Sequence, residues 1–146
     1  MHFFSIFKAL FSSSVKTSVA QEEPLGDLTG LSPEQFLEIS DKLVSKIQQG
    51  TKVVQRMTEL ELPSSPNDLI VAINKSRQTV DELKHTLNPI FAAAREQHEV
   101  DHKKDFSVAI KTLGAATRIH TAAHDFYVAY EELLNKEINA IKQCRS

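Results

Sequence analysis

The chain has 146 residues, a formal net charge of −2 with both signs mixed, and a single cysteine, Cys144. This length makes one domain the natural expectation, and such a domain buries enough surface to fold without a metal or a disulfide. The small negative charge argues against a dedicated nucleic-acid binder, and one cysteine excludes an intramolecular disulfide. Every apolar run is shorter than the roughly 18 residues of a membrane-spanning helix, so we expect no transmembrane segment.

Residues 1–20 have the pattern of a secretory signal peptide. An apolar stretch from Phe3 to Phe11 is followed by small residues, and Ser18 and Ala20 fit the small-x-small rule for cleavage before Gln21. We therefore expect a secreted protein, either extracellular or in a cell wall. Two alternatives stay open: a mitochondrial transit peptide, favoured by lysines and serines without acidic residues, and an amphipathic first helix that remains on the protein.

Residues 21–31 are rich in turn-forming residues, including Pro24, Gly26 and Gly30. This composition predicts a linker, followed by a helical domain over residues 32–146.

The first helix of this domain is predicted to begin at Pro33. Ser32 stands at the cap position and Gln35 follows three residues later, which together form a capping box. The apolar residues at helical spacing, which we expect to be buried, are Phe36, Ile39, Leu43, Ile47, Val54 and Met57. Gly50 lies on the same face, where it indicates either a close contact with another helix, which is favoured, or a dent that leaves room for a ligand.

A second helix is predicted to begin at Pro66, after Ser65 as its cap. We expect it to bury Leu69, Ile70, Ile73, Val80, Leu83 and Leu87. Pro89 should break or kink it, because proline removes a backbone donor and clashes with the preceding turn. The helix then resumes to about Val100, and residues 102–105 form a polar turn.

The last helix is predicted to run from Phe106 to Ile141. One face carries residues at alternating spacings of four and three: Phe106, Ile110, Leu113, Thr117, His120, His124, Tyr127, Glu131, Leu134, Ile138 and Ile141. We expect this face to point into the bundle, with its middle residues as polar groups in the interior. The fold class is therefore all-α, an antiparallel bundle of three to four helices with a long last helix.

Two histidine pairs have the i, i+4 spacing at which a helix can bind a metal ion. His98-Glu99-Val100-Asp101-His102 matches the H-E-x-x-H pattern, in which the histidines hold zinc and the glutamate acts as a base. It lies at a charged helix end, so a solvated terminus is the favoured interpretation. His120 and His124 form the second pair. If the last two helices fold back at residue 103 or 104, His85 comes level with this pair, but the heptad phase predicts that His85 faces outward. We expect a hydrogen-bonded pair and neither metal nor cofactor.

Asn74-Lys75-Ser76 is a glycosylation sequon. Because Asn74 follows the buried Ile73, it should point outward and accept a glycan in a secreted protein.

Short patterns in the chain resemble the fungal hydrophobic surface-binding and cell-wall mannoprotein family over roughly residues 36–134. They are Ile47-x-x-Gly50-Thr51-x-x-Val54 before Leu60-Glu61-Leu62, and Phe91-Ala92-Ala93 before the last helix. The resemblance implies a secreted bundle that binds hydrophobic surfaces or encloses fatty-acid-like lipids. Its cavity would be lined by Phe36, Ile47, Val54, Ile73, Val80, Phe91, Leu113 and Tyr127, with His120 as a polar contact.

Three functional hypotheses follow. The leading one is a secreted, non-enzymatic protein that binds lipid or a hydrophobic surface. The second is a protein-interaction bundle, an effector or an adaptor, which an exposed contiguous apolar patch would favour. The third is a zinc-dependent hydrolase that uses His98, Glu99 and His102.

Overall fold

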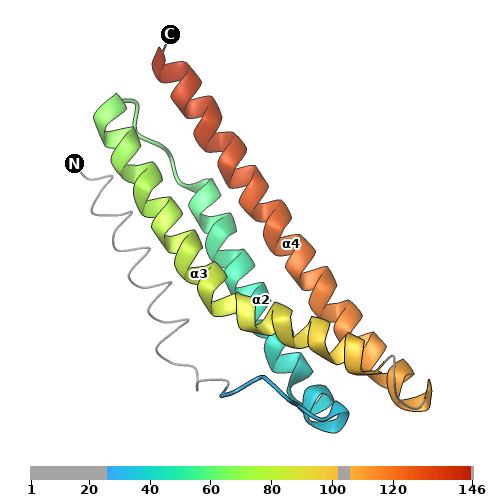
Figure 1. Cartoon of the computed structure of the whole chain (residues 1–146). Helices are drawn as coiled ribbons and strands as arrows, with labels where there is room; N and C mark the ends of the chain where they lie inside the picture. Colours follow the sequence, from blue (N-terminus) through green and yellow to red (C-terminus); the bar gives the residue numbers. More distant parts are fainter. Residues whose placement is uncertain (1–25, 102–105, 146) are drawn as a thin grey trace.

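The computed structural model describes residues 26–101 and 106–145. These ranges contain no strand and three helices: α2 (Pro33–Glu59), α3 (Pro66–Asp101) and α4 (Phe106–Arg145). Each helix runs antiparallel to the one before it, in an up-down-up order (Figure 1). The predicted all-α bundle with a long last helix is confirmed. The expected signal peptide, the start of the linker and the expected polar turn at 102–105 lie outside the described residues.

The end of the linker folds onto the bundle. Gly26 and Gly30 have positive φ angles of 72° and 65°, which glycine adopts without strain. Between them, the Asp27 carboxylate accepts hydrogen bonds from the hydroxyl and the backbone N–H of Thr29 at 2.6 and 2.9 Å, and these bonds lower the pKa of Asp27. The turn directs Leu28 into the core, where it is buried.

The start of α2 follows the prediction. The Ser32 hydroxyl accepts a hydrogen bond from the Gln35 N–H at 3.2 Å, and the Gln35 side chain accepts one from the Ser32 N–H at 2.9 Å. Two of the free donors at the helix start are thereby satisfied. The apolar face is also as predicted, because it buries Phe36, Leu43, Ile47, Val54 and Met57, with Ile39 half-buried.

Gly50 is a point of close packing between α2 and its neighbours. A methyl group built on Gly50 would lie 3.3 Å from Leu87 Cδ1 of α3 and 3.6 Å from Phe126 Cε2 of α4. Side chains from two helices therefore fill the space beside this glycine. Close helix contact is confirmed at this position, and the space left by the missing side chain is not a ligand pocket.

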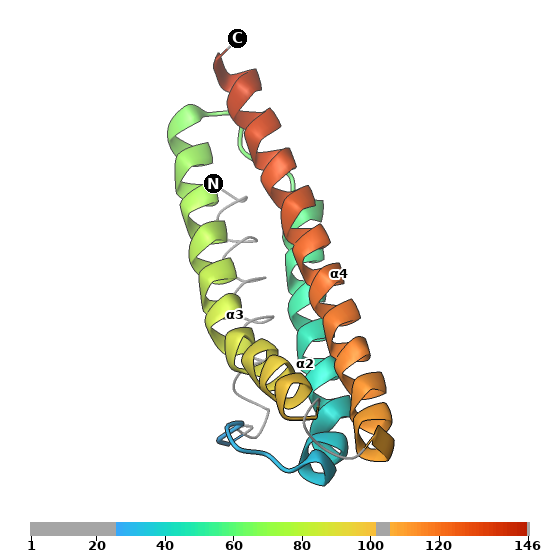
Figure 2. The same ribbon diagram turned by 45° about the vertical axis from the view of Figure 1, so that its right-hand side comes forward.

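Pro89 lies inside α3 and does not break it. The ribbon of α3 bends in the part where its colour passes from green to yellow, which contains Pro89 (Figures 1 and 2). A missing N–H and a clash with the preceding turn explain a kink without a break. Ile70, predicted to be buried near the start of α3, is instead exposed, and Ile73 is half-buried.

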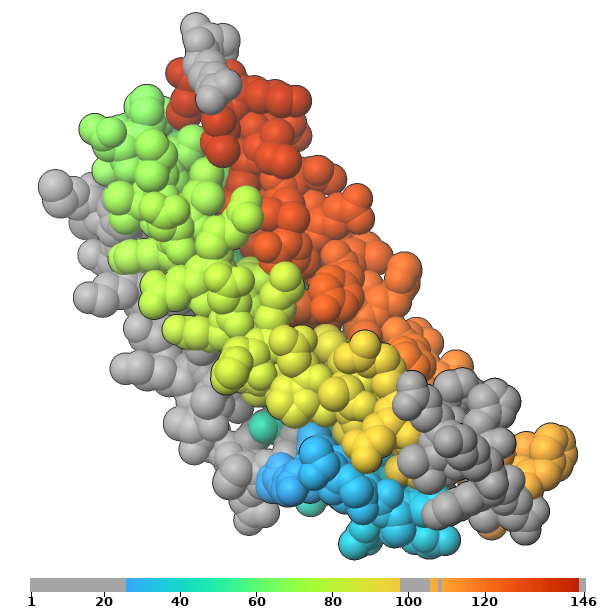
Figure 3. Space-filling view, viewed as in Figure 1, coloured from blue at the N-terminus to red at the C-terminus, as the bar shows by residue number. Residues whose placement is uncertain are grey.

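α4 is the helix that holds the bundle together. It packs along both α2 and α3, whereas α2 and α3 have less contact with each other. In the space-filling view α3 and α4 adjoin on one face, and the part of α2 that shows clearly is its start, at the lower edge (Figure 3). The side chains that α4 contributes to the core are Ala115, Ile119, Ala122, Phe126, Ala129 and Leu133. The alanines among them are small, so both neighbouring helices can approach α4 closely.

Candidate functional site

The face that α4 buries is not the predicted one. Counted along the helix, its buried positions are Thr112, Ala115, Ala116, Ile119, Ala122, Phe126, Ala129, Leu133 and Glu137. The face predicted to be the seam points outward instead. Its large apolar side chains are exposed by 78% at Phe106, 55% at Ile110, 51% at Leu113, 46% at Tyr127, 44% at Ile138 and 37% at Ile141. The prediction that Thr117, His120 and His124 are interior polar groups is wrong, because all three are exposed.

We call this outward face the outer stripe. It consists of Phe106, Ile110, Leu113, Thr117, His120, His124, Tyr127, Glu131, Leu134, Ile138 and Ile141, of which Leu134 is half-buried and the others are exposed. Its spacing of 3.5 residues is that of a coiled-coil seam. At 1.5 Å per residue, the part from Ile110 to Ile141 is about 46 Å long. α4 thus carries two stripes, one that packs in the bundle and one that lies outside it.

The row of residues next to the outer stripe is almost free of charge. Gly114, Thr121, Val128 and Asn135 follow one another at intervals of seven, and all are exposed. The next residue of this row, Lys142, is charged. Gly114 has nothing within 4 Å of the place where a side chain would begin, so the bundle itself does not explain this glycine. Exposed helix faces are usually rich in Lys and Glu, whereas the centres of protein interfaces are poor in them.

The two histidines in the middle of the outer stripe lie on the surface of the bundle. His120 and His124 are exposed, and the neighbouring Thr117 hydroxyl donates to the Leu113 carbonyl of its own helix at 2.8 Å. Within the described ranges there is no group of three His, Cys, Asp or Glu side chains that could hold a metal ion. His85 is exposed on α3, as predicted.

The nine residues expected to form a ligand cavity are divided between the interior and the outside. Phe36, Ile47, Val54 and Val80 are fully buried and belong to one continuous packed core. Leu113, His120 and Tyr127 lie on the outer stripe. The remaining two, Ile73 and Phe91, are half-buried on α3.

Tyr127, at the edge of the outer stripe, contacts two other aromatic rings. The rings of Phe91 and Tyr127 are 6.2 Å apart at an interplanar angle of 40°, and Tyr127 also meets Phe126 edge-on at 5.6 Å. The aromatic contacts hold Tyr127 against α3 while almost half of its surface stays exposed.

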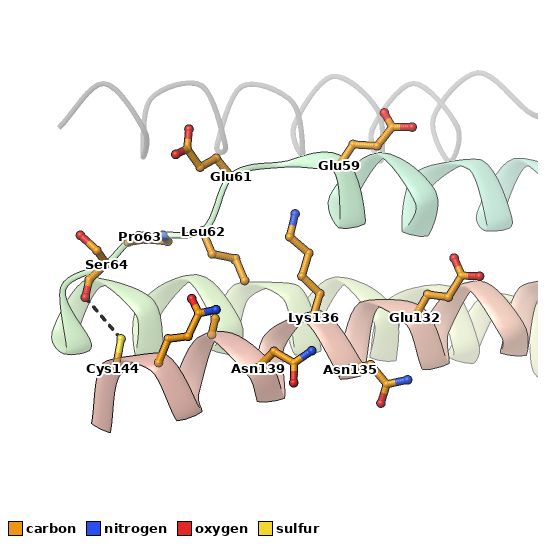
Figure 4. Close-up of a pocket in the computed structure, with 12 residues that line it drawn as sticks. Glu59, Glu61, Leu62, Pro63, Ser64, Glu132, Asn135, Lys136, Asn139 and Cys144 are labelled. Carbon is orange, nitrogen blue, oxygen red and sulfur yellow. Dashed lines mark hydrogen bonds between the residues drawn. The ribbon is translucent and has the colours of Figure 1, made fainter. Parts of the chain in front are cut away.

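A cleft of about 900 Å³ lies at the end of the bundle where α4 ends (Figure 4). It is formed by the α2–α3 connection and the last turns of α4, and its lining residues are Glu59, Glu61, Leu62, Pro63, Ser64, Glu132, Asn135, Lys136, Asn139, Ala140, Gln143 and Cys144. The Lys136 ammonium donates to the carbonyls of Thr58 and Leu60, and the Cys144 thiol donates to the Ser64 carbonyl at 3.3 Å. These contacts satisfy backbone groups where α2 ends, so Lys136 has a structural role in the cleft.

Glu137 is a buried carboxylate that sequence reasoning missed. Its side chain is 1% exposed, and neither carboxylate oxygen accepts a hydrogen bond from the part of the chain that the structure describes. Burial raises the pKa of Glu137, and the charge of Arg77, whose Nε lies 3.6 Å from Oε2, opposes this shift only in part. The spacing of Glu137 from Phe126 and Leu133 would have indicated its burial only if the inward face had been identified first.

The other sequence motifs are placed as follows. α3 ends at Asp101, so His102 of the H-E-x-x-H pattern lies outside the described residues, as do the side chains of His98 and Glu99. Asn74 is exposed on α3, as predicted for a sequon. No helix within the described ranges is long and apolar enough to cross a membrane.

A comparison of the chain with family models, with curated proteins and with solved structures gives no match. The resemblance to the fungal hydrophobic surface-binding family therefore stays an expectation from the short patterns alone.

Proposed function

We propose that this chain is a helical interaction protein, without a catalytic role, that docks another protein along the outer stripe of α4. The observation that carries the proposal is the exposure of Ile110, Leu113, Tyr127, Ile138 and Ile141 on one narrow face. Single exposed apolar residues are ordinary, but several large apolar side chains gathered on one face of a helix mark an interaction site.

A protein partner fits the outer stripe better than a lipid or membrane surface does. Helices that lie on membranes combine a broad apolar face with a polar face rich in Lys and Arg. The outer stripe is narrow, and Thr117, His120, His124 and Glu131 occupy its middle. These polar groups would lose hydrogen bonds against acyl chains, whereas a protein partner can offer them new ones.

Secretion remains part of the proposal. The small-x-small pattern at Ser18 and Ala20 supports export, and the exposed Asn74 can carry a glycan without disturbing the core. Docking would then take place outside the cell that makes the protein.

Site-specific photo-crosslinking in a culture of the cells that produce the full chain, with the medium included, tests the docking role. A benzoyl-phenylalanine placed at Leu113 should form light-dependent covalent adducts with protein, because Leu113 is at the exposed centre of one apolar half of the stripe. The matched control carries the same group at Gln48, an exposed position of α2 outside the stripe. Adducts at Leu113 but not at Gln48, identified by mass spectrometry, would support the proposal. Equal labelling at both positions, or adducts with lipid alone, would contradict it.

A further inference from the structure

We infer that the partner of the outer stripe is a second copy of this chain, with the two α4 helices antiparallel. This inference rests on the docking role proposed above and names the partner for the same surface. The outer stripe consists of two alternating rows. One row is Ile110, Thr117, His124, Glu131 and Ile138; the other is Phe106, Leu113, His120, Tyr127, Leu134 and Ile141.

The two rows are complementary when the helix meets a copy of itself in the opposite direction. A residue of the first row then faces one of the second row, and a two-fold axis makes each pair occur twice. One register pairs every residue of the stripe except Phe106, and its pairs are Ile110 with Ile141, Leu113 with Ile138, Thr117 with Leu134, His120 with Glu131, and His124 with Tyr127. The axis passes between residues 125 and 126.

This register brings apolar residues together at the two ends of the stripe and polar residues together at its centre, with the Thr117–Leu134 pairs between them. The apolar ends of one helix cover the apolar ends of the other, so Ile110, Leu113, Ile138 and Ile141 all become buried. In the centre, the carboxylate of Glu131 can accept a hydrogen bond from the imidazole of His120 in the second copy. The Tyr127 hydroxyl likewise faces His124 of the second copy, so the buried polar groups have partners.

A parallel pairing lacks this complementarity. In register, it would place each Glu131 against the Glu131 of the second copy, and each His120 against another His120. Like charges at close range in a low-dielectric interface are unfavourable, and no hydrogen-bond donor would face the two carboxylates. The sequence of polar groups along the stripe therefore favours the antiparallel arrangement.

The size of the surface sets the expected strength of the dimer. A strip about 46 Å long and about 10 Å wide covers about 500 Å² on each copy. The total of about 1,000 Å² is at the lower limit for a specific interface, which predicts a reversible dimer that depends on protein concentration. The uncharged row with Gly114 and Thr121 at the side of the stripe lets the second helix approach without charge repulsion.

Charge exchange between His120 and Glu131 tests the register. The two residues are 11 positions apart and so lie about 16 Å apart on one helix, and any coupling between them must cross the interface. His120→Glu should raise the dissociation constant of the dimer, measured by sedimentation velocity, about 100-fold. In this variant two carboxylates face each other on each side of the two-fold axis. Glu131→Lys alone should weaken the dimer about tenfold. The double variant should return to within about tenfold of the wild type.

Disulfide formation gives a second measurement that does not depend on charge. In a Cys144→Ser background, a mixture of Thr117→Cys and Leu134→Cys chains should form the mixed disulfide, since these positions face each other. Thr117→Cys alone should form little disulfide, because its two copies would be about 25 Å apart along the axis, beyond the reach of the bond. In a parallel dimer the result would be reversed, with the Thr117→Cys homodimer as the product.

The outcomes separate this inference from the proposed function. The self-pairing would be overturned if the wild type stayed monomeric up to about 1 mM. It would also be overturned if the double variant dimerised as weakly as His120→Glu. If Leu113 nevertheless crosslinks to a different protein in cells, the docking role stands and its partner is that protein. If Leu113 crosslinks to this same chain and the rescue succeeds, both are supported.

Discussion

At the scale of single residues, the buried carboxylate of Glu137 works against the stability of the bundle. It is 1% exposed and has only Arg77 as a charge partner within the described residues, at 3.6 Å without a hydrogen bond. An ionised group in such a place loses more hydration than one half-exposed guanidinium returns. The pKa of Glu137 is raised for this reason, above its ordinary value of 4.5.

The raised pKa predicts how stability depends on pH. The folded chain binds the Glu137 proton more tightly than the unfolded chain does, so this group reduces the free energy of unfolding as pH rises from about 4.5 through the raised pKa. Glu137→Met removes the ionisable group, and at pH 7 it should increase the free energy of unfolding by about 1 kcal/mol. The advantage over the wild type should shrink toward pH 4.5, as Glu137 becomes protonated.

Urea denaturation at a series of pH values measures this difference. Glu132→Gln, at an exposed position of the same helix, is the matched control and should change the free energy of unfolding by less than about 0.5 kcal/mol. A Glu137→Met variant that is less stable than the wild type at pH 7 would show that the carboxylate contributes favourable contacts instead.

At the scale of secondary-structure elements, Lys136 connects the end of α2 to α4. Its ammonium donates to the carbonyls of Thr58 and Leu60, which no longer have partners within the helix. A cation at a helix C-terminus is also favoured by the helix dipole. The contact therefore fixes where the α2–α3 connection leaves the bundle.

Lys136→Met should release this connection. We expect the free energy of unfolding to fall by roughly 1–2 kcal/mol, because two carbonyls lose a charged donor while the aliphatic part of the side chain is retained. Amide hydrogen exchange in residues 60–64 should become faster, with little change in the middle of α2. Lys111→Met is the control, since Lys111 is exposed on α4. Equal effects of the two substitutions would contradict a specific role for Lys136.

The helices themselves were predictable from the sequence, because their limits depend on local chemistry. The capping box at Ser32 and the proline at Pro66 act through nearby backbone groups, so short patterns identify where α2 and α3 begin. The apolar face of α2 was also predictable, since its large apolar residues recur on one side only. The kink at Pro89 belongs to the same class of local effects.

The orientation of α4 was not predictable in the same way. Its outer stripe carries large residues such as Ile110 and Leu113, whereas its inward face depends on Ala115, Ala122 and Ala129. Alanines add little to a hydrophobicity pattern, yet they permit the close packing that fixes α4 between two helices. A search for the most apolar stripe therefore selects the outer one. The residues of the outer stripe were predicted to share one helical face, but that face was assigned to the interior, and only Leu113, His120 and Tyr127 of the stripe were among the expected ligand contacts.

At the scale of the whole molecule, the inward face and the outer stripe of α4 have different roles. The inward face packs against α2 and α3 and completes the bundle, whereas ten of the eleven residues of the outer stripe are exposed. The exposed part of α4 is mixed in character: charged residues such as Lys111, Arg118 and Asp125 lie outside the outer stripe, and within the stripe Glu131 is the one charged residue. Pairing two copies through α4 would bring six of the described helices together, with the outer stripes at the centre.

Thiol reactivity at two neighbouring positions of α4 tests the orientation and the pairing together. In a Cys144→Ser background, a cysteine in place of the exposed His124 should react rapidly with a soluble thiol reagent when the protein is dilute. Its reaction should slow as the protein concentration rises, because pairing covers the outer stripe. A cysteine in place of Ala122, which is 4% exposed, should react slowly at every concentration. Rapid reaction at position 122 with protection at position 124 would contradict this account and place the outer stripe inside the bundle.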